Sequence, residues 1–397
     1  MTDLPVSITH FTEDPRTALQ PVINALQANK QLNITLDIFD WGEALQAYNR
    51  YITQQHGPAV SQIGTTWMGS LVPQNALRPF NPREIALFEG SNAFFPSAWR
   101  STRYQNSRET YAIPWLTDTN LIYYRKDVLK KAGLNEFTSF ATLEQLPQTL
   151  TALQTYGHPM PWISHSGVRS LGMIHHISNW IWGMGGAYMA PDGRQVAFNS
   201  PKARAGIRMY FELQRFIPTT AYGLSDYDAA LRYFNGEAAV VLASADFIEK
   251  LEHFPPEVRE NTAVAVPPGI PFVGGSNWVI WTHTPVRLEQ AALDFIAAIC
   301  STEAQIRLHN ETGVLPARLD ALTQNIHKPH YPVVWKTLQK GWPFPSTRLW
   351  GMIEHRLADA FFIISNALLA NPDADIEMLL DEQLTPLERH LNITLSI

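Results

Sequence analysis

Strand-like and helical segments alternate along the first 67 residues, and this order constrains the fold more than any other feature. Short apolar runs at 6–11, 34–39 and 59–63 have the length and alternation of β-strands. Between them, residues 18–26 and 42–55 carry apolar side chains at helical spacing. A strand–helix–strand–helix–strand order predicts a parallel sheet with right-handed crossovers.

Polar and aromatic residues follow each of the three strands. They are His10–Asp14, Asp40-Trp41 and Thr65–Trp67. Because ligands of such sheets bind outside the carboxyl ends of the strands, we expect a binding site at this edge.

A second α/β unit follows in the middle of the chain. Residues 121–124 and 238–243 are apolar and strand-like, and helical patterns run over 200–214 and 226–235. From Trp335 to the end the sequence is mainly helical. No long linker separates the units, so we expect the chain to cross between them more than once, as in a hinged pair.

Composition excludes several classes of protein. The 397 residues are 45% apolar and carry a net charge of −6, which disfavours a disordered chain and a constitutive nucleic-acid binder. Cys300 is the only cysteine, so neither an intrachain disulfide nor a thiolate zinc site can form. No apolar run approaches the ~20 residues of a membrane span. The N-terminus lacks the pattern of a secretory signal. It predicts either a cytoplasmic protein or a mature periplasmic or cell-surface form with an added Met.

The chain has twelve tryptophans, and many adjoin Gly, Pro, Ser or Thr, where elements end and clefts form. Flat indole faces suit the C–H faces of a sugar ring, and carboxylates, amides and guanidinium groups suit its hydroxyls. This combination favours a carbohydrate ligand, although other polar and partly apolar ligands fit it as well.

Seven segments, in the same order along the chain, resemble those of the family 1 extracellular solute-binding proteins, the maltose-binding-protein-like receptors of carbohydrate ABC importers. They are Tyr111–Asp127 with its YAIPWLTDTNLIYYRKD sequence, Gly64–Trp67, Trp182–Gly186, Ala197–Pro201, Phe234–Val240, Gly274–Trp278 and Thr312–Pro316. The resemblance covers roughly residues 5–360.

This resemblance implies an α/β, type II-like two-lobed periplasmic-binding-protein fold, with a mixed sheet flanked by helices in each lobe. Lobe one would hold residues 1–115 and 270–325, and lobe two would hold 116–269 and 326–397. Such proteins hold ligand in a cleft between the lobes and close on it by hinge bending.

The resemblance and the chemistry of the residues together give a set of ligand-binding candidates. Asp118 would bind sugar hydroxyls, Trp67 would stack on a ring, and Gly275 would let backbone approach the ligand. The full set is Glu13, Trp41, Thr66, Trp67, Asp118, Trp182, Asp246, Gly275, Ser276, Asn277, Trp278, Arg348 and Trp350.

We therefore expect a monomeric, non-enzymatic carbohydrate receptor that serves an ABC permease if it is exported, with no catalytic residues and no cofactor. A cytoplasmic ligand sensor of the same fold is the alternative. A glycoside hydrolase that uses Asp118 and Asp246 is a third hypothesis, although the sequence contains no glycosidase motif. His165, His175 and His176 raise the question of a metal site, but they lack a metal-binding spacing, so no metal is expected.

Overall fold

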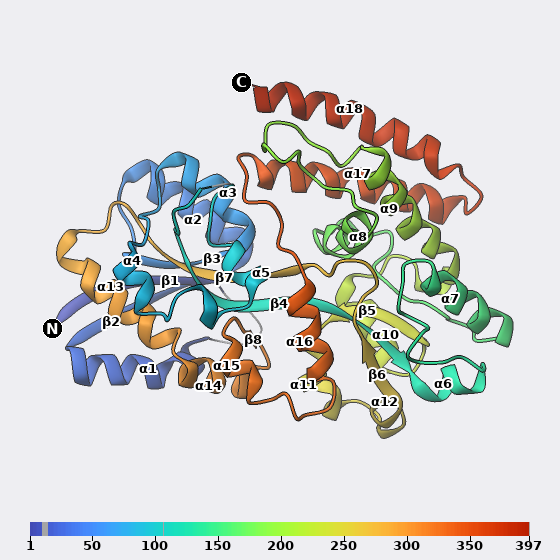
Figure 1. Ribbon diagram of the computed structural model, residues 1–397, viewed down its shortest axis with the longest axis horizontal. Coiled ribbons are helices and arrows are strands. Elements are labelled where there is room, and N and C mark those ends of the chain that lie inside the picture. The colour runs from blue at the N-terminus through green and yellow to red at the C-terminus, as the bar shows by residue number, and fades with distance from the viewer. Residues whose placement is uncertain (10–14, 106, 397) are drawn as a thin grey trace. The chain divides into compact units, whose positions relative to one another are not determined.

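The computed structural model describes residues 1–9, 15–105 and 107–396, which form two compact units. Unit 1 comprises Met1–Asp118, Val273–Lys328 and Pro343–Trp350. Unit 2 comprises Thr119–Phe272, Pro329–Trp342 and Gly351–Ile397. The chain thus passes from one unit to the other five times (Figure 1).

Unit 1 begins with the alternation that the sequence predicts. Its first elements are β1 (Thr2–Thr9), α1 (Pro15–Lys30), β2 (Leu32–Phe39), α2 (Trp41–Gln54) and β3 (Val60–Gly64). Strand β1 pairs in parallel with both β2 and β3, which confirms the predicted parallel arrangement. The first strand starts earlier than residue 6, and the predicted strand positions 10 and 11 lie outside the described residues.

Three later strands complete the unit 1 sheet and make it mixed. Strand β7 (Val273–Ile280) pairs antiparallel with β3, and β4 (Ile113–Arg125) follows β7 in the order β2-β1-β3-β7-β4. The short strand β8 (Leu315–Pro316) pairs with the first part of β4.

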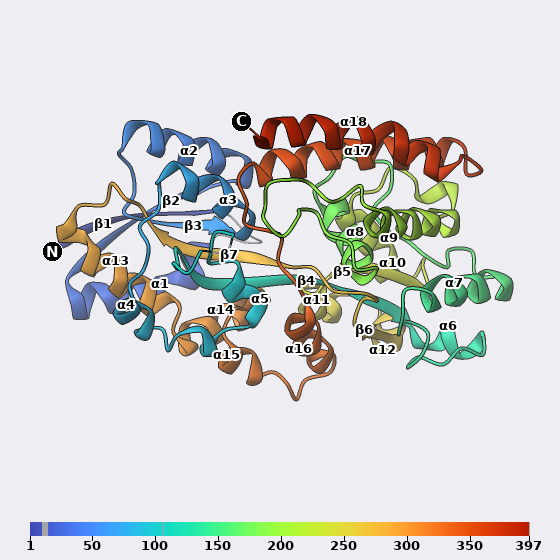
Figure 2. The same ribbon diagram turned by 45° about the horizontal axis from the view of Figure 1, so that its top comes forward.

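Helices cover the unit 1 sheet on both faces. Helices α1, α13 (Val286–Ile299) and α14 (Thr302–Thr312) lie on one face, and α2 lies on the other (Figure 2). The remaining helices of the unit are α3 (Met68–Leu71), α4 (Pro82–Ala86), α5 (Pro96–Arg100) and α15 (Leu319–Thr323).

Unit 2 is built around the second part of β4, which continues through the boundary between the units. Strands β5 (Val240–Ser244) and β6 (Thr262–Ala265) both pair antiparallel with it, so that Ile122 is opposite Leu242 and Ala265. The helices that begin in the middle of the chain are α6 (Lys126–Lys131), α7 (Gln145–Tyr156), α8 (Gly172–Gly183), α9 (Pro201–Glu212), α10 (Asp226–Phe234), α11 (Phe247–Lys250) and α12 (Pro256–Asn261).

The C-terminal part of unit 2 is helical, as the sequence predicts. It consists of α16 (Tyr331–Lys340), α17 (Trp350–Ala370) and α18 (Ile376–Ser396). Helices α17 and α18 lie side by side in both views (Figures 1 and 2). Arg204 of α9 binds Glu377 and Asp381 of α18, and these ion pairs join the C-terminal helix to the centre of the unit. No described helix is long and apolar enough to cross a bilayer.

Helices α8 and α9 pack closely because a glycine stands where they meet. A Cβ placed on Gly206 would lie 2.5 Å from the carbonyl oxygen of Trp180. Alanine is the better helix former, but no real Cβ tolerates a contact of this length. The close approach therefore requires glycine at this position.

We predict that Gly206→Ala lowers the stability of the protein by about 1–3 kcal/mol, because the added methyl group must push the two helices apart. The measurement is the urea unfolding midpoint. Gly351→Ala in α17 is the matched control, because its Cβ would meet no atom within 4 Å. The control should be neutral or stabilising, and an unchanged midpoint for Gly206→Ala would contradict the packing argument.

Candidate functional site

The end of β3, the first half of β7 and the first half of β4 lie next to one another in the unit 1 sheet. Gly64, the last residue of β3, is paired with Ser276 of β7. On the other side of β7, a Cβ on Gly275 would lie 2.1 Å from the carbonyl oxygen of Leu116 in β4. Gly275 also has a φ of +128°, a conformation that other residues rarely adopt. Glycine therefore lets β7 lie close to β4, the strand that carries Asp118.

Asp118 and Ser276 provide polar groups at this edge. Along β4, the positions on both sides of Asp118 are buried, whereas Asp118 itself is exposed. The side chain of Ser276 is only 3% exposed, and its hydroxyl has no hydrogen-bond partner. A buried hydroxyl without a partner is costly unless a water or a ligand group satisfies it.

Two indoles lie next to the end of β3. The short helical turn Thr65–Trp67 follows Gly64 directly and carries Thr66 and Trp67. The rings of Trp41 and Trp67 meet edge to face, with centroids 5.2 Å apart and planes at 74°. A Cβ on Gly64 would be 3.1 Å from the Trp41 ring, so the missing side chain makes room for this indole.

The aromatic pair is supported from within unit 1. Tyr48 packs edge-on against Trp67 at 5.5 Å, and its hydroxyl donates to the Gln62 carbonyl oxygen. Tyr48 is fully buried, and this burial raises the pKa of its phenol well above the usual value. Trp41 remains 42% exposed, so a supported indole is accessible at this edge.

Three other predicted site residues have side chains in the interior. The amide of Asn277 bonds to Ser101, and Trp278 is fully buried between Trp115 and Phe295. Trp350 is also fully buried, with its ring 4.8 Å from that of Phe344. Their side chains are thus engaged in the interior of unit 1, and their role as ligand contacts stays a prediction.

The remaining candidates lie on separate elements. Arg348 is exposed and lies near Tyr104 in unit 1. In unit 2, Trp182 of α8 is only 5% exposed, and Asp246 forms an ion pair with Lys250 at 2.7 Å. Glu13 lies outside the described residues.

Sequence reasoning missed Trp342, which is 41% exposed in unit 2. It stands between Gly341 and Pro343, the same kind of neighbourhood that singled out Trp41 and Trp67.

A second polar cluster lies inside unit 2. Asp226 Oδ1 is 3.7 Å from His165 Nδ1 and 3.7 Å from His176 Nε2. Burial lowers the pKa of both histidines. Not far along α8, His175 Nε2 lies 4.0 Å from a carboxylate oxygen of Glu354, and burial raises the pKa of Glu354 to about 7.

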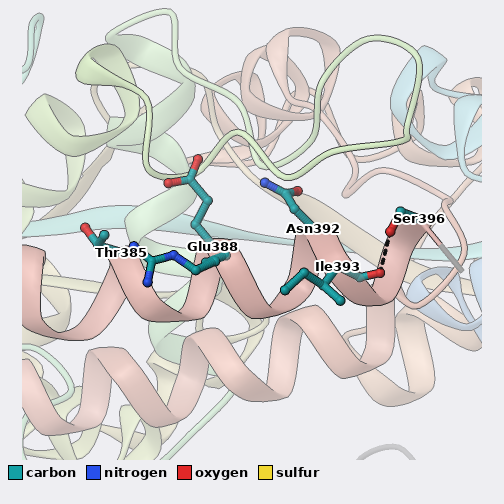
Figure 3. Close-up of a pocket in the computed structure, with 6 residues that line it drawn as sticks. Thr385, Glu388, Asn392, Ile393 and Ser396 are labelled. Atoms are coloured by element: carbon teal, nitrogen blue, oxygen red, sulfur yellow. Dashed lines mark hydrogen bonds between the residues drawn. The ribbon is translucent and has the colours of Figure 1, made fainter.

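Neither this cluster nor a surface hollow on α18 is a better candidate for the ligand site than the edge of the unit 1 sheet. Within the described part of the chain, no group of three His, Cys, Asp or Glu side chains could hold a metal ion. A hollow on α18 is lined by Thr385, Glu388, Arg389, Asn392, Ile393 and Ser396 (Figure 3). Glu388 and Asn392 already accept hydrogen bonds from Asn199 and Val196, so they are engaged in holding α18 to the unit.

Comparison with known proteins identifies the family. Residues 22–333 match the bacterial extracellular solute-binding proteins. The chain belongs to this family. Members of this solute-binding family deliver their ligands to ABC permeases, and the family is extracellular or periplasmic.

Curated relatives of this solute-binding protein include sn-glycerol-3-phosphate-binding periplasmic proteins UgpB. The protein from Yersinia enterocolitica is 22% identical over 278 residues, which cover 65% of this chain and 61% of the relative. The protein from Escherichia coli is 23% identical over 287 residues and is likewise covered over 61% of its length. The match thus spans about three fifths of these relatives.

Solved structures establish the fold of this solute-binding protein. The sugar-binding protein MalE from Xanthomonas citri has a TM-score of 0.84 and 17% identity, with 100% of this chain and 98% of that chain covered. Maltose-bound MalE3 from T. maritima has a TM-score of 0.77 and 18% identity, with 98% and 100% covered. The cyclic α-maltosyl-1,6-maltose binding protein from Arthrobacter globiformis has a TM-score of 0.78 and 13% identity, with 99% of each chain covered. The predicted two-lobed periplasmic-binding-protein fold is therefore confirmed.

The buried histidines predict how stability changes with pH. A histidine whose pKa is lower in the folded state binds a proton more readily when unfolded, so its contribution is complete above about pH 6.5 and is lost on acidification. Glu354 acts in the opposite direction, because its raised pKa gives a contribution that is lost as the pH rises towards 7.

We therefore predict that His165→Gln and His176→Gln each reduce the loss of stability between pH 7.5 and 5.5. The measurement is the urea unfolding midpoint at several pH values. Each variant is compared with wild type at the same pH, so that the contribution of Glu354 to stability, which all the proteins share, cancels. His390→Gln on the exposed side of α18 is the control and should follow wild type. Equal pH dependence in all four proteins would contradict the assignment.

Proposed function

We propose that this protein is a carbohydrate receptor that binds a neutral sugar or oligosaccharide, leaves its bonds intact and delivers it to an ABC importer. The observation that carries the proposal is the end of β3, where Ser276 is paired with Gly64 beside the Trp41–Trp67 pair, together with the exposed Asp118 on β4, the strand that adjoins β7. A carboxylate and a hydroxyl suit sugar hydroxyls, and indole faces suit the C–H faces of the ring.

The proposed site consists of Trp41, Thr66, Trp67, Asp118, Gly275 and Ser276, with Arg348 as a further candidate. Membership of the solute-binding family supports the receptor role, and the sugar-binding proteins of similar fold support the ligand class. A ligand held also by groups of unit 2 would stabilise a closed form, because binding shifts an existing open–closed equilibrium.

The receptor acts outside the cytoplasm as a monomer, and ABC permease subunits are its partners. The periplasmic relatives support this location. The protein is not an enzyme in this proposal. Of the two carboxylates that a hydrolase would need, Asp246 is already neutralised by Lys250, which supports binding without cleavage.

Glycerol 3-phosphate is the second candidate ligand, because the curated relatives are named for it. The charge at the proposed site argues against it. A phosphate needs cationic or N–H donor groups, whereas Asp118 is an acceptor that repels an anion.

A thermal-shift screen separates the two ligands. We predict that at least one sugar among maltose, maltotriose, trehalose and D-tagatose raises the melting temperature, because a ligand that binds only the folded state stabilises it. Glycerol 3-phosphate should leave the melting temperature unchanged. A shift with glycerol 3-phosphate alone would replace the carbohydrate proposal, and cleavage of a sugar during incubation would contradict the non-enzymatic role.

For the sugar that binds most tightly, we predict that Asp118→Asn weakens binding by about 1–3 kcal/mol, the usual value of a hydrogen bond to a charged group. Titration calorimetry gives the affinity, and the urea midpoint checks folding. Asp373→Asn, in the exposed turn before α18, is the matched control and should bind as wild type does. Full affinity in Asp118→Asn would remove this carboxylate from the site.

A further inference from the structure

A buried glutamine stands in β3 just before the strand ends. Gln62 is only 1% exposed and lies two residues before Gly64, where the proposed ligand site begins. Burying an amide is costly unless its polar atoms are hydrogen-bonded, and an apolar side chain would fill this position without that cost. Packing alone therefore does not explain why a glutamine stands here.

The side chain of Gln62 holds the end of β1. Its Oε1 atom accepts from the backbone N–H of Thr9, at 2.7 Å, and also from the hydroxyl of Thr9. Thr9 is fully buried and is the last residue of β1. The paired residues of β1 and β3 extend to Ser7 and Ser61. The two bonds of Gln62 therefore continue the connection between the strands to the very end of β1.

The acceptor oxygen is the part of the Gln62 side chain that the fold uses. A backbone N–H can only donate, so the Thr9 N–H identifies the amide atom facing it as the oxygen. Among the residues that the structure describes, the Nε2 atom of Gln62 has no hydrogen-bond partner. An amide supplies the acceptor without the charge that a carboxylate would bring into the interior.

The backbone of Gln62 holds the aromatic part of the same edge. Its carbonyl oxygen accepts from the hydroxyl of Tyr48. The ring of Tyr48 packs edge-on against Trp67, and Trp67 in turn meets Trp41. Gln62 is thus bonded both to the end of β1 and to the residue that supports the indole pair, and all of these residues lie in unit 1.

We propose that Gln62 is a positioning residue of the ligand site, which fixes the end of β1 relative to the indole pair by binding Thr9. This inference rests on the proposed carbohydrate-binding function. In the sequence, Thr9 is followed by residues 10–14, which include the candidate Glu13, so the bond also fixes the point from which that segment starts. Gln62 itself does not touch the ligand. Its effect is that the ligand meets groups already held in place, so that binding requires less ordering.

The test compares Gln62→Met with the wild-type full-length protein by titration calorimetry. The ligand is the tightest-binding sugar among maltose, maltotriose, trehalose and D-tagatose, and the urea midpoint checks folding. Methionine has a similar length but offers Thr9 no oxygen acceptor. Gln62→Met should therefore weaken binding about fivefold or more, a loss in the range of one neutral hydrogen bond.

Gln305 of α14 provides a matched control. It is also only 1% exposed and lies in unit 1, and its Oε1 atom accepts from the backbone N–H of Arg318 at 3.1 Å. Its Nε2 atom likewise has no hydrogen-bond partner within the described part of the chain. Gln305→Met thus removes a comparable buried bond from another element. It should lower the urea midpoint as Gln62→Met does, but bind the sugar as wild type does.

Two variants of Thr9 test the same contact from its other side. Thr9→Val removes the hydroxyl and keeps the shape, so it should weaken binding about threefold. Thr9→Ser keeps the hydroxyl and should bind as wild type does. If Gln62→Met does not fold, this pair decides the question.

The positioning role is overturned if folded Gln62→Met and Thr9→Val bind as wild type does, or if Gln305→Met loses as much affinity as Gln62→Met. In either case the receptor function stands. If the wild-type protein binds none of the four sugars, the proposed function fails, and the inference fails with it.

Discussion

The close approach of β7 to β4 at Gly275 determines where the candidate ligand groups lie. A side chain at this position would run into the Leu116 carbonyl oxygen, so the two strands could not lie as they do. Strand β7 is also paired with β3, which sets Ser276 opposite Gly64, while its other side faces β4, the strand that carries Asp118. The polar part of the proposed site depends on this contact.

The aromatic part of the site depends on a second missing side chain, that of Gly64. Trp41 occupies the space beside this glycine and meets Trp67, which Tyr48 supports from the interior. Indole faces match the C–H faces of a sugar ring, and a carboxylate matches its hydroxyls. The chemistry of the edge therefore agrees with the solute-binding family to which the chain belongs.

Much of the fold follows from local sequence, whereas the direction of individual side chains does not. Apolar patterning gives β2, β3 and α2 nearly to the residue, since β2 and α2 each have one buried face and β3 is a short, wholly buried run. Strand β7 is buried on both faces, so its sequence lacks the alternation that would tell Ser276 from Asn277 and Trp278. Trp342 was missed for a related reason. A tryptophan beside glycine or proline marks the end of an element, but only packing decides whether its ring is covered, as in Trp350, or exposed.

The most direct test of the account is the set of indole N–H signals in an NMR spectrum of the ¹⁵N-labelled protein, recorded during titration with a neutral sugar. The account predicts that the signals of Trp41 and Trp67 move together as the sugar binds, while those of the interior residues Trp162 and Trp281 stay in place. Saturating sugar that leaves both signals unmoved would contradict it.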